Sequence, residues 1–116
     1  MHKKANELRW EVQVNRRGGK GSINVEHISE PDDLYGMGKL LARTVIPAGC
    51  SIGKHYHNGD FEVYYFTKGK GLLDDNGEIV QVGPGDMMMC KDGDYHAIEN
   101  IGEEDLEYIA VITAIK

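Results

Sequence analysis

The residues best suited to chemistry lie in one short stretch, which runs from His55 to Glu62 and reads HYHNGDFE. In a β-strand, residues i and i+2 point to the same face, so His55 and His57 would share a face. Asn-Gly is a strong signal for a two-residue hairpin turn. With such a turn at Asn58-Gly59, His55 would lie opposite Glu62 on the same side of the sheet. Two imidazoles and a carboxylate on one patch predict a site for a metal ion.

The residues after Glu62 favour a pocket. A surface hairpin with a solvated polar face is the alternative explanation for any lone His-x-His sequence. Here Tyr64 and Phe66 fall on the same strand face as Glu62. A carboxylate buried beside aromatic rings needs a charged partner or a metal, because an unpaired buried charge is costly. We therefore interpret this face as the wall of a pocket.

Another imidazole could join this group from a distant part of the chain. His96 lies in a strand-like piece that follows the turn signal Gly93-Asp94. Only the fold can bring His96 close to His57. Of the other histidines, His2 lies in the polar N-terminal segment, and His27 has the pattern of a surface or edge-strand residue, so neither is expected to be a ligand.

Short apolar or alternating runs recur along the chain with turn signals between them. They predict strands at residues 10–14, 23–28, 40–46, 55–57, 61–67, 72–73, 79–82, 86–90, 96–99 and 106–115. Asn76-Gly77 predicts a tight hairpin between two of these strands. No long window has the period of an amphipathic helix. The pattern predicts an all-β fold, either a sandwich or a small barrel, in which sheet closure protects strand edges.

Length and charge exclude several classes of protein. The chain has 116 residues, enough for one domain, and its 13 basic and 19 acidic residues give a net charge of −6. Such a charge argues against a nucleic-acid partner and against a polybasic membrane anchor. We recognise neither a membrane-spanning apolar run nor a signal peptide. Cys50 and Cys90 are therefore expected to be reduced thiols, in a cytoplasmic protein.

Two segments resemble the two sequence motifs of the cupin family. The first motif is matched by Gly49-(x)5-His55-x-His57-(x)4-Glu62-(x)6-Gly69. The second is matched by Gly85-(x)5-Lys91-x-Gly93-(x)2-His96-(x)3-Asn100. Lys91 is the one departure, because the motif expects proline at this turn position. The resemblance covers residues 40–112.

The resemblance implies a fold and a metal site. The fold would be a double-stranded β-helix, the jelly-roll barrel of cupins, with residues 10–116 as a single cupin domain. The polar composition of residues 1–9 predicts a flexible N-terminal tail. One divalent transition metal would be held by His55, His57, Glu62 and His96. Manganese is favoured, with iron, nickel, zinc or copper as alternatives. The resemblance also implies a homodimer, in which the N-terminal strands cross to the partner.

Within the family, the chain resembles the small single-domain cupins related to oxalate decarboxylase. This implies a small carboxylic acid as ligand, with the metal as Lewis acid and template. Arg43 could grip a carboxylate of the ligand, although an exposed position on the outer sheet face is as plausible. Tyr64 could donate a hydrogen bond to the substrate, with core packing as the alternative. Whether the chain is an enzyme stays open at this point.

Two other functions remain as alternatives. One is a sugar or sugar-phosphate isomerase, in which the metal polarises a carbonyl. The other is a non-enzymatic, metal-dependent protein that binds or senses a small ligand. Arg16 and Arg17 belong to a glycine-rich turn that reads as a solvated hairpin tip, so only Lys54 and Arg43 are expected as basic residues near the pocket.

Overall fold

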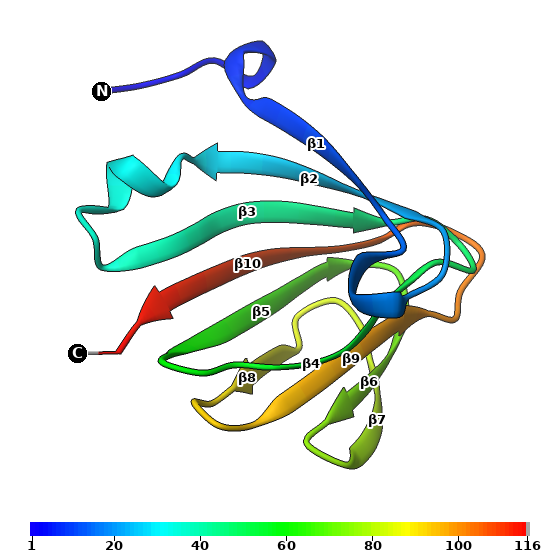
Figure 1. Ribbon diagram of the computed structural model, residues 1–116. Coiled ribbons are helices and arrows are strands. Elements are labelled where there is room, and N and C mark those ends of the chain that lie inside the picture. Colours follow the sequence, from blue (N-terminus) through cyan, green and yellow to red (C-terminus); the bar gives the residue numbers. More distant parts are fainter. Residues whose placement is uncertain (116) are drawn as a thin grey trace.

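The chain folds into two antiparallel β-sheets that face each other, and the computed structural model describes residues 1–115 (Figure 1). The strands are β1 (Arg9–Val14), β2 (Ser22–Ser29), β3 (Gly38–Ile46), β4 (Ser51–Tyr56), β5 (Asp60–Lys68), β6 (Gly71–Asp75), β7 (Glu78–Val82), β8 (Met87–Cys90), β9 (Tyr95–Asn100) and β10 (Leu106–Ala114). Three short 3₁₀ turns complete the fold, namely η1 (Ala5–Glu7), η2 (Arg16–Gly18) and η3 (Pro31–Leu34). Each predicted strand overlaps one of the observed strands, so the all-β prediction is confirmed.

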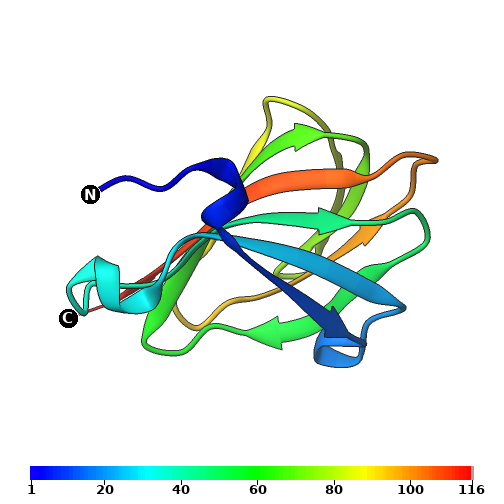
Figure 2. The same ribbon diagram turned by 90° about the horizontal axis from the view of Figure 1, so that it is seen from above.

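The strand order confirms the predicted jelly roll. The larger sheet has the order β1-β2-β3-β10-β5-β8, and the smaller sheet has the order β4-β9-β6-β7. From β3 onwards the chain passes repeatedly from one sheet to the other, which is how a double-stranded β-helix is wound. Figures 1 and 2 place η2 at one end of β1 and β2, and η1 and η3 at the other end.

Alternation along the strands buries one face of each sheet against the other. On β10, Leu106, Tyr108 and Ala110 are buried, while the residues between them turn outward. The ring of Tyr108 stacks on that of Tyr64, with 3.9 Å between their centroids, and lies 5.4 Å from that of Phe66. These rings and the aliphatic side chains around them form the core between the two sheets.

The hairpin predicted at Asn58-Gly59 is wrong. Strand β4 pairs with β9, whereas β5 pairs with β8 and β10, so the segment between them crosses from one sheet to the other. A type I′ hairpin needs positive φ at both central residues, and here only Gly59 has it, at 76°. In the predicted hairpin at Asn76-Gly77 both residues have positive φ, 51° and 99°, and the turn does join β6 to β7.

The N-terminal segment, the cysteines and the absence of a membrane span were also predicted from the sequence. Residues 1–9, predicted as a flexible tail, contain η1 and the first residue of β1, and their flexibility stays a prediction. Both cysteines are free, as expected for reduced thiols. Among residues 1–115, no helix is long and apolar enough to cross a membrane.

Neighbouring leucines on β6 test which face of the smaller sheet carries the core. Leu73 is 2% exposed and Leu72 is 37% exposed. We expect Leu73→Ala to lower the free energy of unfolding by about 2–5 kcal/mol, because it leaves a cavity between the sheets. We expect Leu72→Ala to cost much less. Urea denaturation of both variants measures the difference, and equal losses would contradict the packing described here.

Candidate metal centre

Four side chains with metal-ligating atoms converge between the two sheets, and they are His55, His57, Glu62 and His96. His55 on β4 is the cross-strand partner of His96 on β9, His57 follows β4, and Glu62 lies on β5 of the larger sheet. One ligand atom from each residue lies within 4.8 Å of the others. The structure thus brings together the four residues predicted as ligands, and this group is able to bind a metal ion.

The spacing of the ligand atoms suits a single ion. Nε2 of His96 lies 3.0 Å from Nε2 of His57 and 3.0 Å from Nε2 of His55. Oε1 of Glu62 lies 3.2 Å from Nε2 of His57 and 3.1 Å from Nε2 of His96. Two ligands at right angles, each about 2.1 Å from an ion, would be about 3.0 Å apart, against about 3.4 Å at the tetrahedral angle. These four separations are thus close enough for the atoms to reach one ion together.

The opposite ring nitrogens are held by groups that accept hydrogen bonds. Nδ1 of His55 lies 2.8 Å from the carbonyl oxygen of Gly53, and Nδ1 of His57 lies 2.9 Å from Oδ1 of Asp60. Nδ1 of His96 lies 3.2 Å from Sδ of Met88. Because these groups accept, each Nδ1 carries the proton, and in a neutral imidazole the Nε2 lone pair is then left facing the cluster. Three lone pairs and a carboxylate that face one another form a favourable place for a cation.

The close packing of these groups shifts the pKa values of His55, His57 and Glu62. Burial lowers the pKa of His55 to about 4, so its imidazole is neutral near pH 7. The Glu62 carboxylate raises the pKa of His57, and Asp60 adds to this effect. Burial on its own would raise the pKa of Glu62, but the neighbouring imidazoles of His57 and His96 lower it. Glu62 is thus ionised, and it attracts positive charge to the point where a metal would lie.

Tyr64 lies where the sequence placed it, on the wall beside the cluster. Its ring centroid is 5.3 Å from that of His96, and its side chain lines the cavity that contains His55, His57 and Glu62. Tyr64 is also buried and stacked on Tyr108, so it takes part in the core as well. Burial raises the pKa of its phenol well above the usual value, so the hydroxyl keeps its proton.

Arg43 lies on the outer face of β3, away from the cluster. Its guanidinium donates to Glu26 at 2.9 Å and to Glu107, and it packs 5.2 Å above the ring of Trp10. Its neighbours on β3, Ala42 and Thr44, are buried and point inward. A role for Arg43 in gripping a substrate is not supported by this placement.

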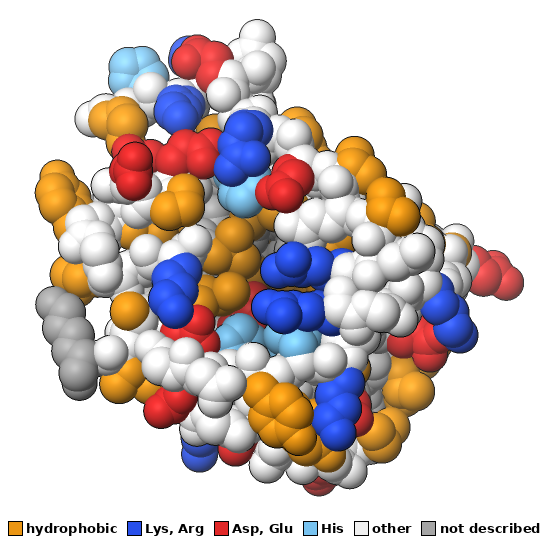
Figure 3. All heavy atoms as spheres, viewed as in Figure 1, with side chains coloured by type: hydrophobic (Ala, Val, Ile, Leu, Met, Phe, Trp, Pro, Cys, Tyr) orange, Lys and Arg blue, Asp and Glu red, His pale blue; other side chains and the backbone are white. Residues whose placement is uncertain are grey.

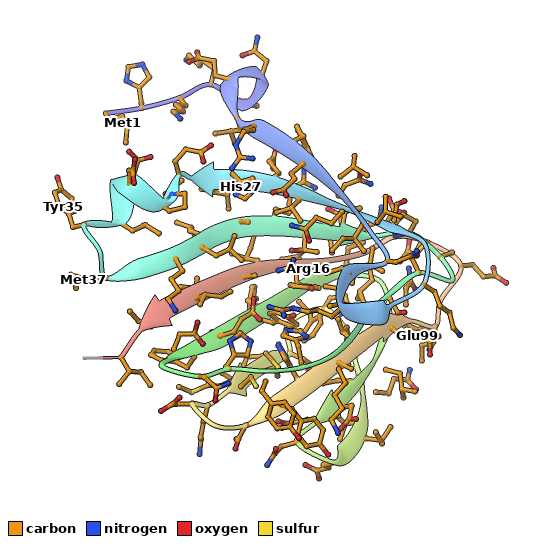
Figure 4. All side chains as sticks on the ribbon, in the orientation of Figure 1. Met1, Arg16, His27, Tyr35, Met37 and Glu99 are labelled. Atoms are coloured by element: carbon orange, nitrogen blue, oxygen red, sulfur yellow. The ribbon has the colours of Figure 1, made fainter. Side chains whose placement is uncertain are left out.

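Arg16 and Arg17, which sequence analysis placed on a solvated tip, are exposed and also line the cavity. The cavity has a volume of about 220 Å³, and its lining includes Arg16, Arg17 and Lys39 as well as His55 and His57. Figure 3 shows Lys or Arg side chains next to His side chains in a hollow on this face, and Figure 4 labels Arg16 there. The expectation that Lys54 lies near the pocket is wrong, because its Nζ lies over the ring of Tyr95 at 4.2 Å, away from this cavity.

The turn that carries these arginines lies over the cavity because η2 packs against β4. The backbone N–H of Ser51 donates to the carbonyl of Lys20 at 2.9 Å, and the N–H of Lys20 donates to Oγ of Ser51 at 2.9 Å. The one signal in the sequence is the pair of arginines in front of two glycines. That signal indicates a tight basic turn, but it does not say against which strand the turn packs.

Comparisons with known proteins agree with this geometry. The family model of the cupin domain matches residues 42–112, which is more than half of the chain. An oxalate-binding protein of Thermotoga maritima is 39% identical over 109 residues, which cover 94% of this chain and 90% of that protein. An uncharacterised protein of Methanocaldococcus jannaschii is 32% identical over 89 residues, covering 77% of this chain and 70% of that protein.

Solved structures show the same fold. The crystal structure of a protein from Thermotoga maritima, described as a predicted oxalate decarboxylase, superposes with a TM-score of 0.94 at 38% identity. The match covers 99% of this chain and 100% of that one. KdgF from Halomonas superposes with a TM-score of 0.76 at 16% identity, covering 97% of this chain and 94% of that one, which is a likeness of fold alone.

Removing one imidazole of the cluster tests its metal binding. We expect His96→Ala to weaken metal affinity by more than about 100-fold, since changes to mere partners of metal ligands already cost about 10- to 100-fold. Elemental analysis of protein purified without an affinity tag, together with calorimetric titration of divalent ions, measures this loss. His2→Ala is the matched control, because His2 is exposed in the N-terminal segment. Full metal content in the folded His96→Ala protein would contradict the site.

Proposed function

This chain belongs to the cupin domain family, and we propose that it holds one divalent transition metal through His55, His57, Glu62 and His96 and binds a small carboxylate of the oxalate type beside it. The observation that carries the proposal is the convergence of three imidazole lone pairs and one carboxylate on a small basic cavity. The 39% identical oxalate-binding protein of Thermotoga maritima supports the choice of ligand.

We propose manganese as the metal. The cluster offers imidazole nitrogen and carboxylate oxygen, and Glu62 has Cys90 as its cross-strand partner on β8. Burial raises the pKa of Cys90 to about 12, so its thiol stays protonated and is not expected to compete as a ligand. Nitrogen and oxygen ligands without thiolate suit Mn(II) and similar ions. A bound metal of this kind supplies a Lewis acid for the oxygens of a carboxylate.

Binding is better supported than catalysis. Within the described part of the chain, Glu62 is the sole carboxylate that lines the cavity, and it belongs to the cluster. Burial raises the pKa of Tyr64 and of Tyr108, so both phenols hold their protons tightly. The cavity of about 220 Å³ is smaller than the ~300–1,000 Å³ typical of drug-sized ligands, which favours a ligand as small as oxalate. An oxalate-decarboxylase-like reaction is the second candidate, favoured by the likeness to the Thermotoga structure of that description.

Oxalate titration of the manganese-loaded protein tests this function. We expect the melting temperature to rise with oxalate, because a ligand at about 100 times its Kd stabilises the folded state by about 2.7 kcal/mol. The metal-free protein should show no such rise. Release of carbon dioxide or uptake of oxygen, measured on the same samples, would support the decarboxylase-like reaction. No thermal shift with oxalate, and aldose–ketose interconversion of sugar phosphates instead, would contradict the proposal in favour of an isomerase.

We also propose a homodimer that forms through β1, in a cytoplasmic protein whose thiols stay reduced. Strand β1 is at the end of its sheet and pairs with β2 alone, so one of its edges is open. Its outward side chains are apolar, with Trp10 48%, Val12 63% and Val14 67% exposed. Rows of exposed apolar side chains on an open edge are typical of an interface.

A charge placed in this row tests the dimer. We expect Val12→Glu to convert the dimer to a monomer, because a buried unpaired carboxylate at the interface is costly. Sedimentation velocity measures the molar mass of the variant and of the wild type. Ile79→Glu is the control, since Ile79 is exposed on the end strand of the other sheet. A monomeric wild type, or a dimer that survives Val12→Glu, would contradict this interface.

A further inference from the structure

Two arginines at the cavity have no acidic partner among residues 1–115. Arg16 and Arg17 line the cavity of the histidine cluster, and no carboxylate within residues 1–115 lies within 4.0 Å of either guanidinium. The other two arginines of the chain are both paired, Arg9 with a glutamate at 2.8 Å and Arg43 with two glutamates. In a chain with a net charge of −6, two unpaired guanidiniums at one cavity indicate an anion from outside the chain.

The turn that carries these arginines is fixed by close backbone packing. A Cβ atom at Gly19 would lie 2.2 Å from the carbonyl oxygen of Ser51, and one at Gly53 would lie 2.0 Å from the carbonyl oxygen of Arg17. Neither glycine has a positive φ, so the need for glycine here is a need for space. The backbone of the turn therefore touches β4 directly, and β4 is the strand that carries His55.

The same turn contains backbone strain next to the cavity. Asn15 and Arg17 adopt left-handed conformations, with φ of 50° and 54°. Such conformations are uncommon for residues with a side chain, and they persist where surrounding structure holds them. Arg17 itself has the left-handed backbone, although glycine, which adopts this conformation more easily, occupies the next two positions, 18 and 19. The position of the arginine side chains is thus maintained against a local cost.

We propose that the η2 turn is the anion-binding wall of the cavity, in which Arg16 and Arg17 bind the carboxylate oxygens of the ligand that face away from the metal. The wall selects dianionic carboxylates over monoanionic ones. This inference rests on the proposed function, because it assumes that the ligand is bound at the cluster.

Charge balance supports this selection. A divalent ion held by three neutral imidazoles and one carboxylate keeps one positive charge, and the two guanidiniums lie at the same cavity. Lys39 also lines the cavity, but its Nζ is already paired with Asp60 at 2.9 Å. A single carboxylate satisfies the metal and leaves the arginines without a partner. A dicarboxylate offers further oxygens, and guanidinium donors fit such oxygens in pairs.

The test compares oxalate with acetate on manganese-loaded protein by calorimetric titration. We expect Arg16→Gln with Arg17→Gln to weaken oxalate binding by about tenfold or more, because charge-assisted hydrogen bonds to the ligand are lost. Metal affinity and acetate affinity should change far less. The wild-type oxalate affinity should also fall more steeply with ionic strength than that of the variant. Arg9→Gln is the control for a general effect of lost positive charge, since it removes one arginine from a site outside the cavity.

A second variant tests the position of the turn without removing a charge. We expect Gly19→Ala to displace η2 from β4 and to weaken oxalate binding while manganese affinity is kept. Gly83→Ala is its control, because an added Cβ there would meet its nearest neighbour at an ordinary 3.7 Å.

The possible outcomes separate this inference from the proposed function. If wild-type protein binds manganese but no oxalate, the proposed function fails, and the inference fails with it. If wild type binds oxalate and the double arginine variant binds it equally well, the inference is overturned and the proposed function stands. Equal losses of oxalate and acetate affinity would also overturn the inference, because they would show no selection for the second carboxylate.

Discussion

The structure depends on three imidazole lone pairs and one carboxylate that are held face to face in a buried place. Electron pairs at about 3 Å repel unless a proton or a cation lies between them. The acceptors behind the rings, such as Gly53 and Asp60, fix which nitrogen carries the proton. They also hold the ring orientations, so the rings cannot rotate to relieve the repulsion. The fold keeps an arrangement that costs energy when empty, and a divalent ion is the simplest partner that removes this cost.

The two sheets contribute differently to this arrangement. The smaller sheet and the segment after β4 provide the three imidazoles, while the larger sheet provides Glu62 and the aromatic floor of Tyr64 and Tyr108. A metal bound by the group would therefore join both sheets at one point. Because a preformed group of this kind exists only in the folded chain, binding energy at the site becomes folding energy.

Sequence patterns predicted the strands and the four clustered residues, but not how they meet. Alternation and turn residues locate strands because they reflect local chemistry, and the spacing of His55 and His57 follows from strand geometry. The hairpin at Asn58-Gly59 was wrong because the same dipeptide can close a hairpin or let the chain cross between sheets, and long-range pairing decides which. Side chains alternate between the two faces of β3, and Arg43 falls on the outer face. Which face is the outer one follows from the pairing of β3 with β2 and β10. The position of Arg16 depends on how η2 packs on β4. A turn has no residue periodicity, so the sequence does not indicate this contact.

The separation of charge in this acidic chain gives the cavity its character. Most basic side chains that pair with acids do so on the outer surface, as Arg9 and Arg43 do. At the cavity, the Asp60 carboxylate pairs with Lys39 through one oxygen and contacts Nδ1 of His57 through the other. Among residues 1–115, Arg16 and Arg17 have no such acidic partner, which leaves a positive opening on a protein whose overall charge repels anions. If the proposed anion site is right, a small anion is attracted to this opening, where both the guanidiniums and a bound metal would act on it.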